Sequence, residues 1–231
     1  MLLEFKTSNY KSFKDEMRFS MVPAPKQTGL DYSIMRTEIH KRIYKALCSS
    51  VIYGPNASGK TNIVGAMDTF KSIVLRGHIR DTDDVNDPNA ASCKLELIPN
   101  NSLEKPAPVY FYIKFIVDDM LIEYSFNADI GEFLEADQRK ILTESLIINE
   151  KLIFLRNEAI KFGFLDDIDA FMIKDFQQYE SGAISLAQNS LNNDELFLMN
   201  GFKNIFSTEL VTLIREWLSN KFMVIYRADA I

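Results

Sequence analysis

The stretch VIYGPNASGKTN, residues 51–62, decides how this sequence is expected to fold. It matches the pattern G-x-x-x-x-G-K-[ST] at every fixed position, which are Gly54, Gly59, Lys60 and Thr61. Gly54 allows a tight turn, and Gly59 lets backbone N–H groups approach phosphate oxygens without a side chain in the way. The pattern therefore predicts a phosphate-binding loop between a strand and a helix.

The chemistry of ATP predicts a role for each part of this loop. The following helix begins at the loop, so the positive end of its dipole would face the phosphates. Lys60 would reach the β- and γ-phosphates, and the Thr61 hydroxyl would bind Mg²⁺. The predicted nucleotide-binding residues of the loop are Gly54, Pro55, Asn56, Ala57, Ser58, Gly59, Lys60, Thr61 and Asn62, with Thr61 as the metal ligand.

The segments around the loop carry clear periodic patterns. Residues 2–22 are predicted as two strands joined by a polar turn within residues 9–15. The run ALCSSVIY, residues 46–53, predicts a short buried strand in front of the loop. After the loop, apolar residues at helical spacing over 63–74 predict a helix that ends at Gly77.

The rest of the chain divides into hairpins and helices. An acidic exposed loop is predicted over 80–92, and two hairpins over 109–127 and 141–157. From residue 166 the pattern becomes helical, before a last apolar strand over 221–227. The expected fold is an α/β core with an antiparallel lobe beside it. We expect a nucleotide-binding domain over 1–165, followed by a helical segment and final strand over 166–231.

The loop and the first strand resemble one family of ATPases. GPNASGKTN resembles the GPNGSGKSN loop of the ABC-type ATPases that include RecF and the SMC proteins, with Ala57 where that family usually has glycine. LLEFKTSNYKSF resembles their N-terminal strand, which implies that Lys11 and Ser12 lie near the nucleotide. The segment 107–157 is similar to the hairpin lobe of the OLD-like and AAA-15-type ATPases. These occur in bacterial antiphage systems such as Septu, PARIS and retron-linked modules.

The resemblance implies a fold and a function. It implies a P-loop ABC-ATPase-like head that binds ATP and Mg²⁺ and forms a homodimer or a higher homo-oligomer. Nucleotide occupancy would then act as a switch in antiviral defence on an effector protein such as a nuclease or a toxin. Two alternatives stay open: a RecF- or SMC-like ATPase of DNA repair or maintenance, and a nucleotide-sensing scaffold that does not hydrolyse ATP.

The signature, Walker B and switch-histidine motifs of such ATPases are not evident in the sequence. Asp118-Asp119 could end a Walker B strand, but a two-residue hairpin turn is the favoured interpretation. Ser181-Gly182 could begin a signature helix, although a helix N-cap is favoured for Ser181. Gln188 is a weak candidate for a Q-loop glutamine. In the resembling family these motifs lie toward the C-terminal end of the chain. We therefore expect this chain to be the N-terminal, nucleotide-holding half of an ABC-type ATPase head.

Two further side chains receive structural interpretations. Arg156 could act on a phosphate held by a neighbouring subunit, but a surface ion pair is favoured. Trp217 is predicted to lie in the core or at an interface. No carboxylates cluster with the spacing of a nuclease metal site.

Charge and hydropathy restrict the partners. The formal net charge is −6 and the pI is about 5.1, so the overall balance does not favour nucleic acid, although a local basic patch stays open. No apolar run approaches the length of about 20 residues that spans a bilayer. We expect a cytoplasmic protein without a membrane partner, and the two cysteines, Cys48 and Cys93, suit a reducing compartment.

Overall fold

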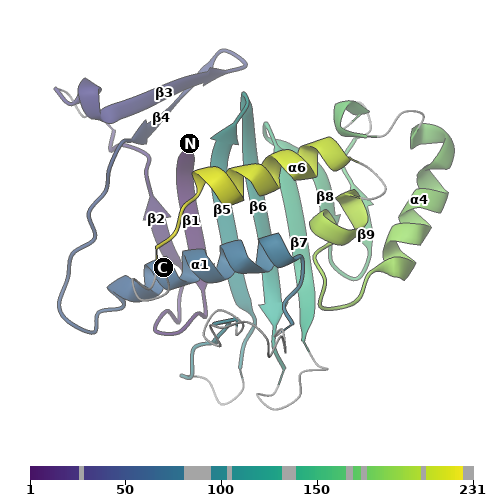
Figure 1. Ribbon diagram of the computed structural model, residues 1–231, viewed down its shortest axis with the longest axis horizontal. Coiled ribbons are helices and arrows are strands. Elements are labelled where there is room, and N and C mark those ends of the chain that lie inside the picture. The colour runs from purple at the N-terminus through teal and green to yellow at the C-terminus, as the bar shows by residue number, and fades with distance from the viewer. Residues whose placement is uncertain are drawn as a thin grey trace.

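The computed structural model describes residues 1–25, 29–80, 95–102, 106–131, 139–164, 169–172, 176–203 and 207–225. Its centre is a seven-stranded sheet in which every pair of neighbouring strands is antiparallel (Figure 1). In spatial order the strands are β2 (Met17–Ser20), β1 (Leu2–Ser8), β5 (Val109–Val117), β6 (Met120–Asp129), β7 (Lys140–Ile148), β8 (Lys151–Arg156) and β9 (Ile160–Phe162).

The two faces of this sheet differ in chemistry because side chains alternate along each strand. On β5, residues 109, 111, 113 and 115 are buried, whereas the residues between them are only half-buried. On the half-buried face, Lys114 forms an ion pair with Glu123 across the β5–β6 register. The sheet therefore has one apolar face to be covered and one polar face.

Two helices cover the apolar face (Figure 1). The first is α1 (Lys60–Arg76), whose Phe70 ring packs against the rings of Phe5, Phe111, Tyr124 and Phe126. The second is α6 (Thr208–Glu216), which continues into the π-helical turn η5 (Trp217–Lys221). Trp217 is buried and stacks on Phe115, with ring centroids 3.9 Å apart, so it takes the first of its two predicted positions, the core or an interface.

Further helical elements complete the fold. They are the 3₁₀ turns η1 (Asp31–Ser33) and η3 (Asp169–Phe171), the helix α4 (Phe176–Ser190) and the π-helical turn η4 (Leu198–Phe202). The predicted nucleotide-binding domain, 1–165, and the predicted helical segment, 166–231, share one core. In that core Phe154 of β8 packs edge-on against Phe197 at the start of η4. The predicted boundary near residue 165 stays a prediction. Among the described helices, none is long and apolar enough to cross a membrane.

A second, two-stranded sheet stands at one end of the molecule (Figure 1). It is the hairpin of β3 (Ile34–Ile39) and β4 (Arg42–Leu47), and it packs on the main sheet through Ile39 and Ala46. The sequence did not predict this hairpin. Its turn residues, His40 and Lys41, have φ of 47° and 66° but are not the Asn and Gly that usually mark such turns.

The structure confirms several local predictions. The predicted hairpins are β5–β6 and β7–β8, and Asp118 and Asp119 form the turn of the first with φ of 44° and 59°. The helix after the glycine loop ends at Gly77, which has φ of 79° and donates its N–H to Ile73 O. Asp118 and Asp119 are therefore hairpin residues and not a Walker B pair.

Two predicted strands are wrong. The run 46–53 is not one strand, because β4 ends at Leu47 and residues 48–53 form no strand. Val51 and Tyr53 are 82% and 90% exposed, since no described strand lies beside them to pair their backbone and cover their side chains. Likewise, residues 223–225 of the predicted last strand are not in a strand, and residues 226 and 227 lie outside the described part.

A buried carboxylate connects the sheet to η4. Glu144 of β7 is 0% exposed and accepts hydrogen bonds from Tyr124 Oη at 2.8 Å, Phe197 N at 2.6 Å and Leu198 N at 2.9 Å. The Arg156 guanidinium lies 3.6 Å from it. Burial is the dominant influence and raises the pKa of the Glu144 carboxyl above its ordinary value.

The surface ion pair favoured for Arg156 is therefore wrong, because this side chain is buried. Arg156 Nη1 also donates to Glu195 O at 2.5 Å, so its guanidinium bridges β8 and the segment before η4. Its position is that of a structural residue within the core.

Candidate nucleotide-binding site

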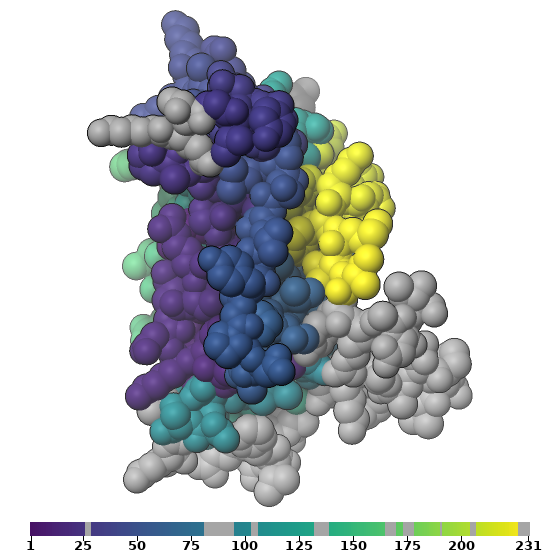
Figure 2. All heavy atoms as spheres, turned by 90° about the vertical axis from the view of Figure 1, so that its left-hand side faces the viewer, coloured from purple at the N-terminus to yellow at the C-terminus, as the bar shows by residue number. Residues whose placement is uncertain are grey.

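The glycine loop lies at the surface, immediately before α1. Residues 51–58 are exposed, and Gly59 and Lys60 are half-buried where the helix begins. Figure 2 shows the loop and α1 in blue, between the N-terminal strands in purple and the C-terminal helices in yellow. The site is therefore open to a ligand from one side.

Gly59 is the residue on which the shape of the loop depends. It is the N-cap of α1 and has φ of 87°, a left-handed conformation that favours glycine. A Cβ at this position would lie 2.7 Å from Ser12 Oγ and 3.4 Å from the Phe13 ring. Because Gly59 has no side chain to cap α1, the first N–H groups of the helix are available to an anion.

The Lys60 side chain turns back across the loop. Its Nζ donates to Gly54 O at 2.8 Å and to Pro55 O at 2.5 Å. The ammonium is thus held against the carbonyl groups of the loop, and Thr61, the next residue, is exposed. A loop that brings together a lysine ammonium, the start of a helix and an exposed threonine hydroxyl fits a nucleotide triphosphate with Mg²⁺.

The turn after β1 packs against the loop. Tyr10 and Phe13 exchange backbone hydrogen bonds at 2.9 and 2.8 Å, which places Lys11 and Ser12 at the tip. Ser12 Oγ accepts a hydrogen bond from Asn62 Nδ2 at 2.8 Å, so the structure brings Ser12 and Asn62 together beside Gly59. The Lys11 ammonium instead lies 2.5 Å from Glu96.

Ala57 adopts a conformation that is unusual for alanine. Its φ is 62°, in the left-handed region that costs about 1–2 kcal/mol for a residue with a Cβ. This gives a physical reason for the glycine that the resembling family carries there. Phe13, which packs at Gly59, is the site residue that the sequence did not single out.

Substituting Gly59 by alanine tests the shape of the loop. We expect ATP to bind at least about tenfold more weakly, because the Cβ meets Ser12 and the left-handed φ is disfavoured by about 1–2 kcal/mol. The matched control is Gly182→Ala, inside α4, where an added Cβ has no neighbour within 4 Å. The control should gain up to about 1 kcal/mol of stability and keep its affinity. Calorimetric titration with ATP compares them, and wild-type affinity in Gly59→Ala would contradict this account.

The other candidate motifs lie away from helix starts. Ser181 is inside α4, which begins at Phe176, so it is neither the start of a signature helix nor an N-cap. Gln188 lies near the end of the same helix. The acidic run 81–84 lies outside the described residues.

Metal-binding side chains are not gathered elsewhere in the described part of the chain. There, no group of three or more His, Cys, Asp or Glu side chains is placed to hold a metal ion. The predicted metal ligand is therefore the Thr61 hydroxyl, and this assignment stays a prediction.

The comparison with protein families agrees with the loop. Residues 49–193, more than half of the chain, match the family model described as "AAA domain, putative AbiEii toxin, Type IV TA system". The matched segment begins just before the glycine loop and includes α1 and the β5–β6 and β7–β8 hairpins. Searches of curated proteins and of solved structures returned no significant match. The chain therefore belongs to this family of AAA-domain P-loop ATPases.

Proposed function

We propose that this chain is the ATP-binding domain of an OLD-like or AAA-15-type ABC ATPase in bacterial antiviral defence. It acts there as a nucleotide-dependent switch on an effector such as a nuclease or a toxin. The observation that carries the proposal is the loop geometry, in which Gly59 opens the start of α1 and Lys60 lies across the loop. The family description, which names a putative toxin of a type IV toxin–antitoxin system, supports a connection to a toxin.

This geometry supports assigning nucleotide binding to the residues of the loop. The backbone N–H groups of the loop and of the first turn of α1 bind the phosphates, and Lys60 supplies a positive charge to their oxygens. Thr61 holds Mg²⁺, which neutralises charge on the phosphates when it is bound. Ser12 and Asn62 keep the turn after β1 against the loop through their hydrogen bond.

The exposure of the loop suits a nucleotide shared between two copies. Residues 51–58 are exposed, so this chain by itself covers the site from one side only. If a second surface closes over bound ATP, the closed state binds ATP more tightly than the open state. Differential affinity of this kind is what allows a ligand to shift a conformational equilibrium.

Phage challenge tests the proposal. Bacteria that carry the native gene with its neighbouring genes are infected with a panel of phages, and the efficiency of plating is measured. We expect protection by the wild type, loss of protection with Lys60→Ala, and full protection with Lys161→Ala, an exposed lysine of β9. Protection that survives Lys60→Ala, or a wild type that protects against none of the phages, would contradict the proposal.

A further inference from the structure

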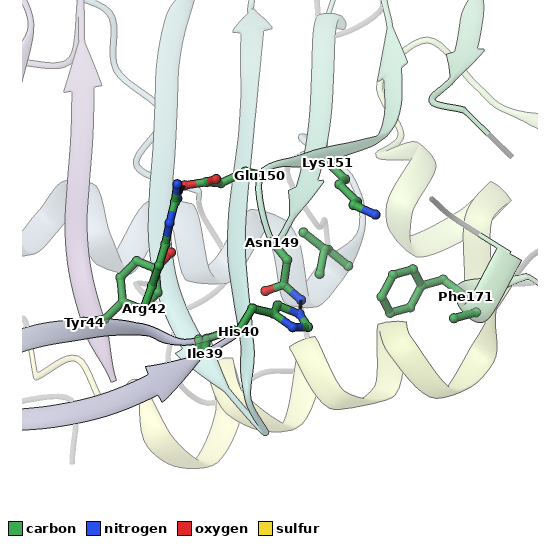
Figure 3. A pocket seen from close by; sticks show the side chains of 10 residues that line it. Ile39, His40, Arg42, Tyr44, Asn149, Glu150, Lys151 and Phe171 are labelled. Carbon is green, nitrogen blue, oxygen red and sulfur yellow. Dashed lines mark hydrogen bonds and ion pairs between the residues drawn. The ribbon is translucent and has the colours of Figure 1, made fainter. Parts of the chain in front are cut away.

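Two hollows lie beside the β3–β4 hairpin, outside the glycine loop. The first, at the tip of the hairpin, is shown in Figure 3. Its cations are engaged, because Arg42 forms an ion pair with Glu150 and Lys151 has an interaction of its own. The second, which we call the hairpin-base hollow, lies between the hairpin, strands β1, β2 and β5, and residues 22–25. Its volume of about 550 Å³ is within the size range of pockets that bind small ligands.

One wall of the hairpin-base hollow is apolar. Ile43 of β4 and Val22 line it and are 63% and 49% exposed. Pro23 and Pro25 follow Val22 in the lining, and their rings fix the backbone φ at both positions. The wall therefore presents apolar surface that a ligand can cover at little cost in ordering the chain.

Lys45 supplies positive charge next to this wall. It lies two residues from Ile43 on β4, so both side chains are on the same face of the hairpin. Lys45 is exposed, and it forms no ion pair with any residue in the part of the chain that the structure describes. Its ammonium is thus available to an anion that enters the hollow.

The remaining charges of the lining neutralise one another or are neutralised by neighbours. Arg18 of β2 forms an ion pair with Glu4 of β1. Lys114 of β5 lies opposite Glu4 in the β1–β5 register and forms its ion pair with Glu123, at 2.9 Å. The hollow therefore combines a neutralised polar floor with an apolar wall and one available cation.

We propose that the hairpin-base hollow binds a small amphiphilic anion, which has one carboxylate or phosphate head on an apolar body about the length of an eight-carbon chain. The head pairs with the Lys45 ammonium, and the body covers Ile43 and Val22. Charge complementarity selects an anion, and the burial of exposed apolar surface selects one with an apolar body. The proposal does not depend on the proposed function of the glycine loop.

Isothermal titration of the full chain tests this site with probes that differ in head group and chain length. We expect octanoate or octyl phosphate to bind with a Kd of about 0.1–1 mM, and the tighter of the two identifies the head group. Hexanoate should bind about tenfold more weakly than octanoate, because each buried methylene contributes about fourfold in affinity. Octan-1-ol, which has the apolar body without the charge, should bind about fivefold more weakly or worse.

Variants of the two walls and a control assign the binding to the hollow. Lys45→Glu should weaken binding of the tighter anion about tenfold or more, and Lys45→Arg should keep it within about threefold. Ile43→Ser should weaken it about fivefold through lost apolar contact. Lys161→Glu makes the same charge change on β9, outside the hollow, and should stay within about twofold of the wild type. Melting temperatures show whether each variant folds.

Any one of several results would overturn the proposal. The first is that neither octanoate nor octyl phosphate binds below about 10 mM. A second is equal affinity for hexanoate and octanoate, which would mean that the apolar wall is not used. A third is equal weakening by Lys45→Glu and Lys161→Glu, which would show a diffuse charge effect. Tighter binding of an apolar peptide with a free terminal carboxylate than of either anion would make the hollow a peptide site instead.

Discussion

Replacing Lys60 with alanine is expected to weaken ATP binding by about two orders of magnitude. The ammonium lies over the loop, where it now bonds to Gly54 O and Pro55 O, and it would transfer those bonds to phosphate oxygens. Hydrogen bonds between charged groups are about twice as strong as neutral ones, and a hundredfold change in affinity corresponds to about 2.7 kcal/mol. Isothermal titration of each protein with Mg²⁺-ATP measures the difference.

The folded state should tolerate this change. Lys60 is only half-buried and its contacts are with its own loop, so the free energy of unfolding should change by less than about 1 kcal/mol. Lys161→Ala serves as the matched control, because it removes an exposed lysine from β9. If the control lost as much affinity as Lys60→Ala, the effect would come from overall charge and not from the loop.

Substituting Glu144 by alanine is expected to destabilise the protein by about 3–5 kcal/mol. The carboxylate accepts hydrogen bonds from Tyr124, Phe197 and Leu198, and it lies beside the buried Arg156 guanidinium. Its removal leaves these donors without their acceptor in a site that water does not reach. Urea denaturation measures the loss, with Glu158→Ala, at an exposed position after β8, expected within about 0.5 kcal/mol of the wild type.

The same carboxylate predicts a dependence of stability on pH. Burial raises its folded-state pKa above the ordinary value, so between the two values the folded state binds more protons than the unfolded state. This group's contribution to stability is therefore largest at low pH and falls as pH rises through that window. Glu144→Gln removes the titration, so the stability of the wild type relative to this variant should decline as the pH is raised from about 4.5. A difference that grew with pH would show that the folded-state pKa is lowered instead.

The parts of the fold that the sequence predicted are those with local signals. The Asp118-Asp119 and Asn149-Glu150 turns interrupt apolar alternation, and Gly77 follows a regular helical pattern. Residues close together in the sequence were therefore enough to predict these turns and this helix end. The β3–β4 hairpin was missed because its turn, His40-Lys41, has ordinary side chains in left-handed conformations. Neither residue is one of the Asn, Asp or Gly residues that usually mark such a turn in a sequence.

The errors arose where distant segments decide the outcome. An apolar run such as residues 51–53 forms a strand only if neighbouring strands satisfy its backbone, and the described part of the chain provides none. Glu144 bonds to Phe197 and Leu198, more than fifty residues away, and this also explains why the interpretation of Arg156 failed. Pairings at such separation leave no pattern in a single sequence.

The candidate site was predicted in two different ways. The roles of Gly59 and Lys60 followed from the chemistry of phosphate binding, and the structure shows a conformation that suits them. The proximity of Ser12 was implied only by family resemblance, and the hydrogen bond from Asn62 now gives it a physical basis. The left-handed φ of Ala57 could not be read from the sequence, because alanine seldom adopts it.

The most direct test of the central claim is amide hydrogen exchange of the wild-type chain with and without Mg²⁺-ATP, followed by mass spectrometry. Binding by the loop should slow exchange in peptides that cover residues 54–62 and the turn at 9–13, because nucleotide would occupy the N–H groups and hold Ser12 in place. Peptides from the buried strand β7 should exchange as before. Unchanged exchange over 54–62 at saturating ATP would contradict the account.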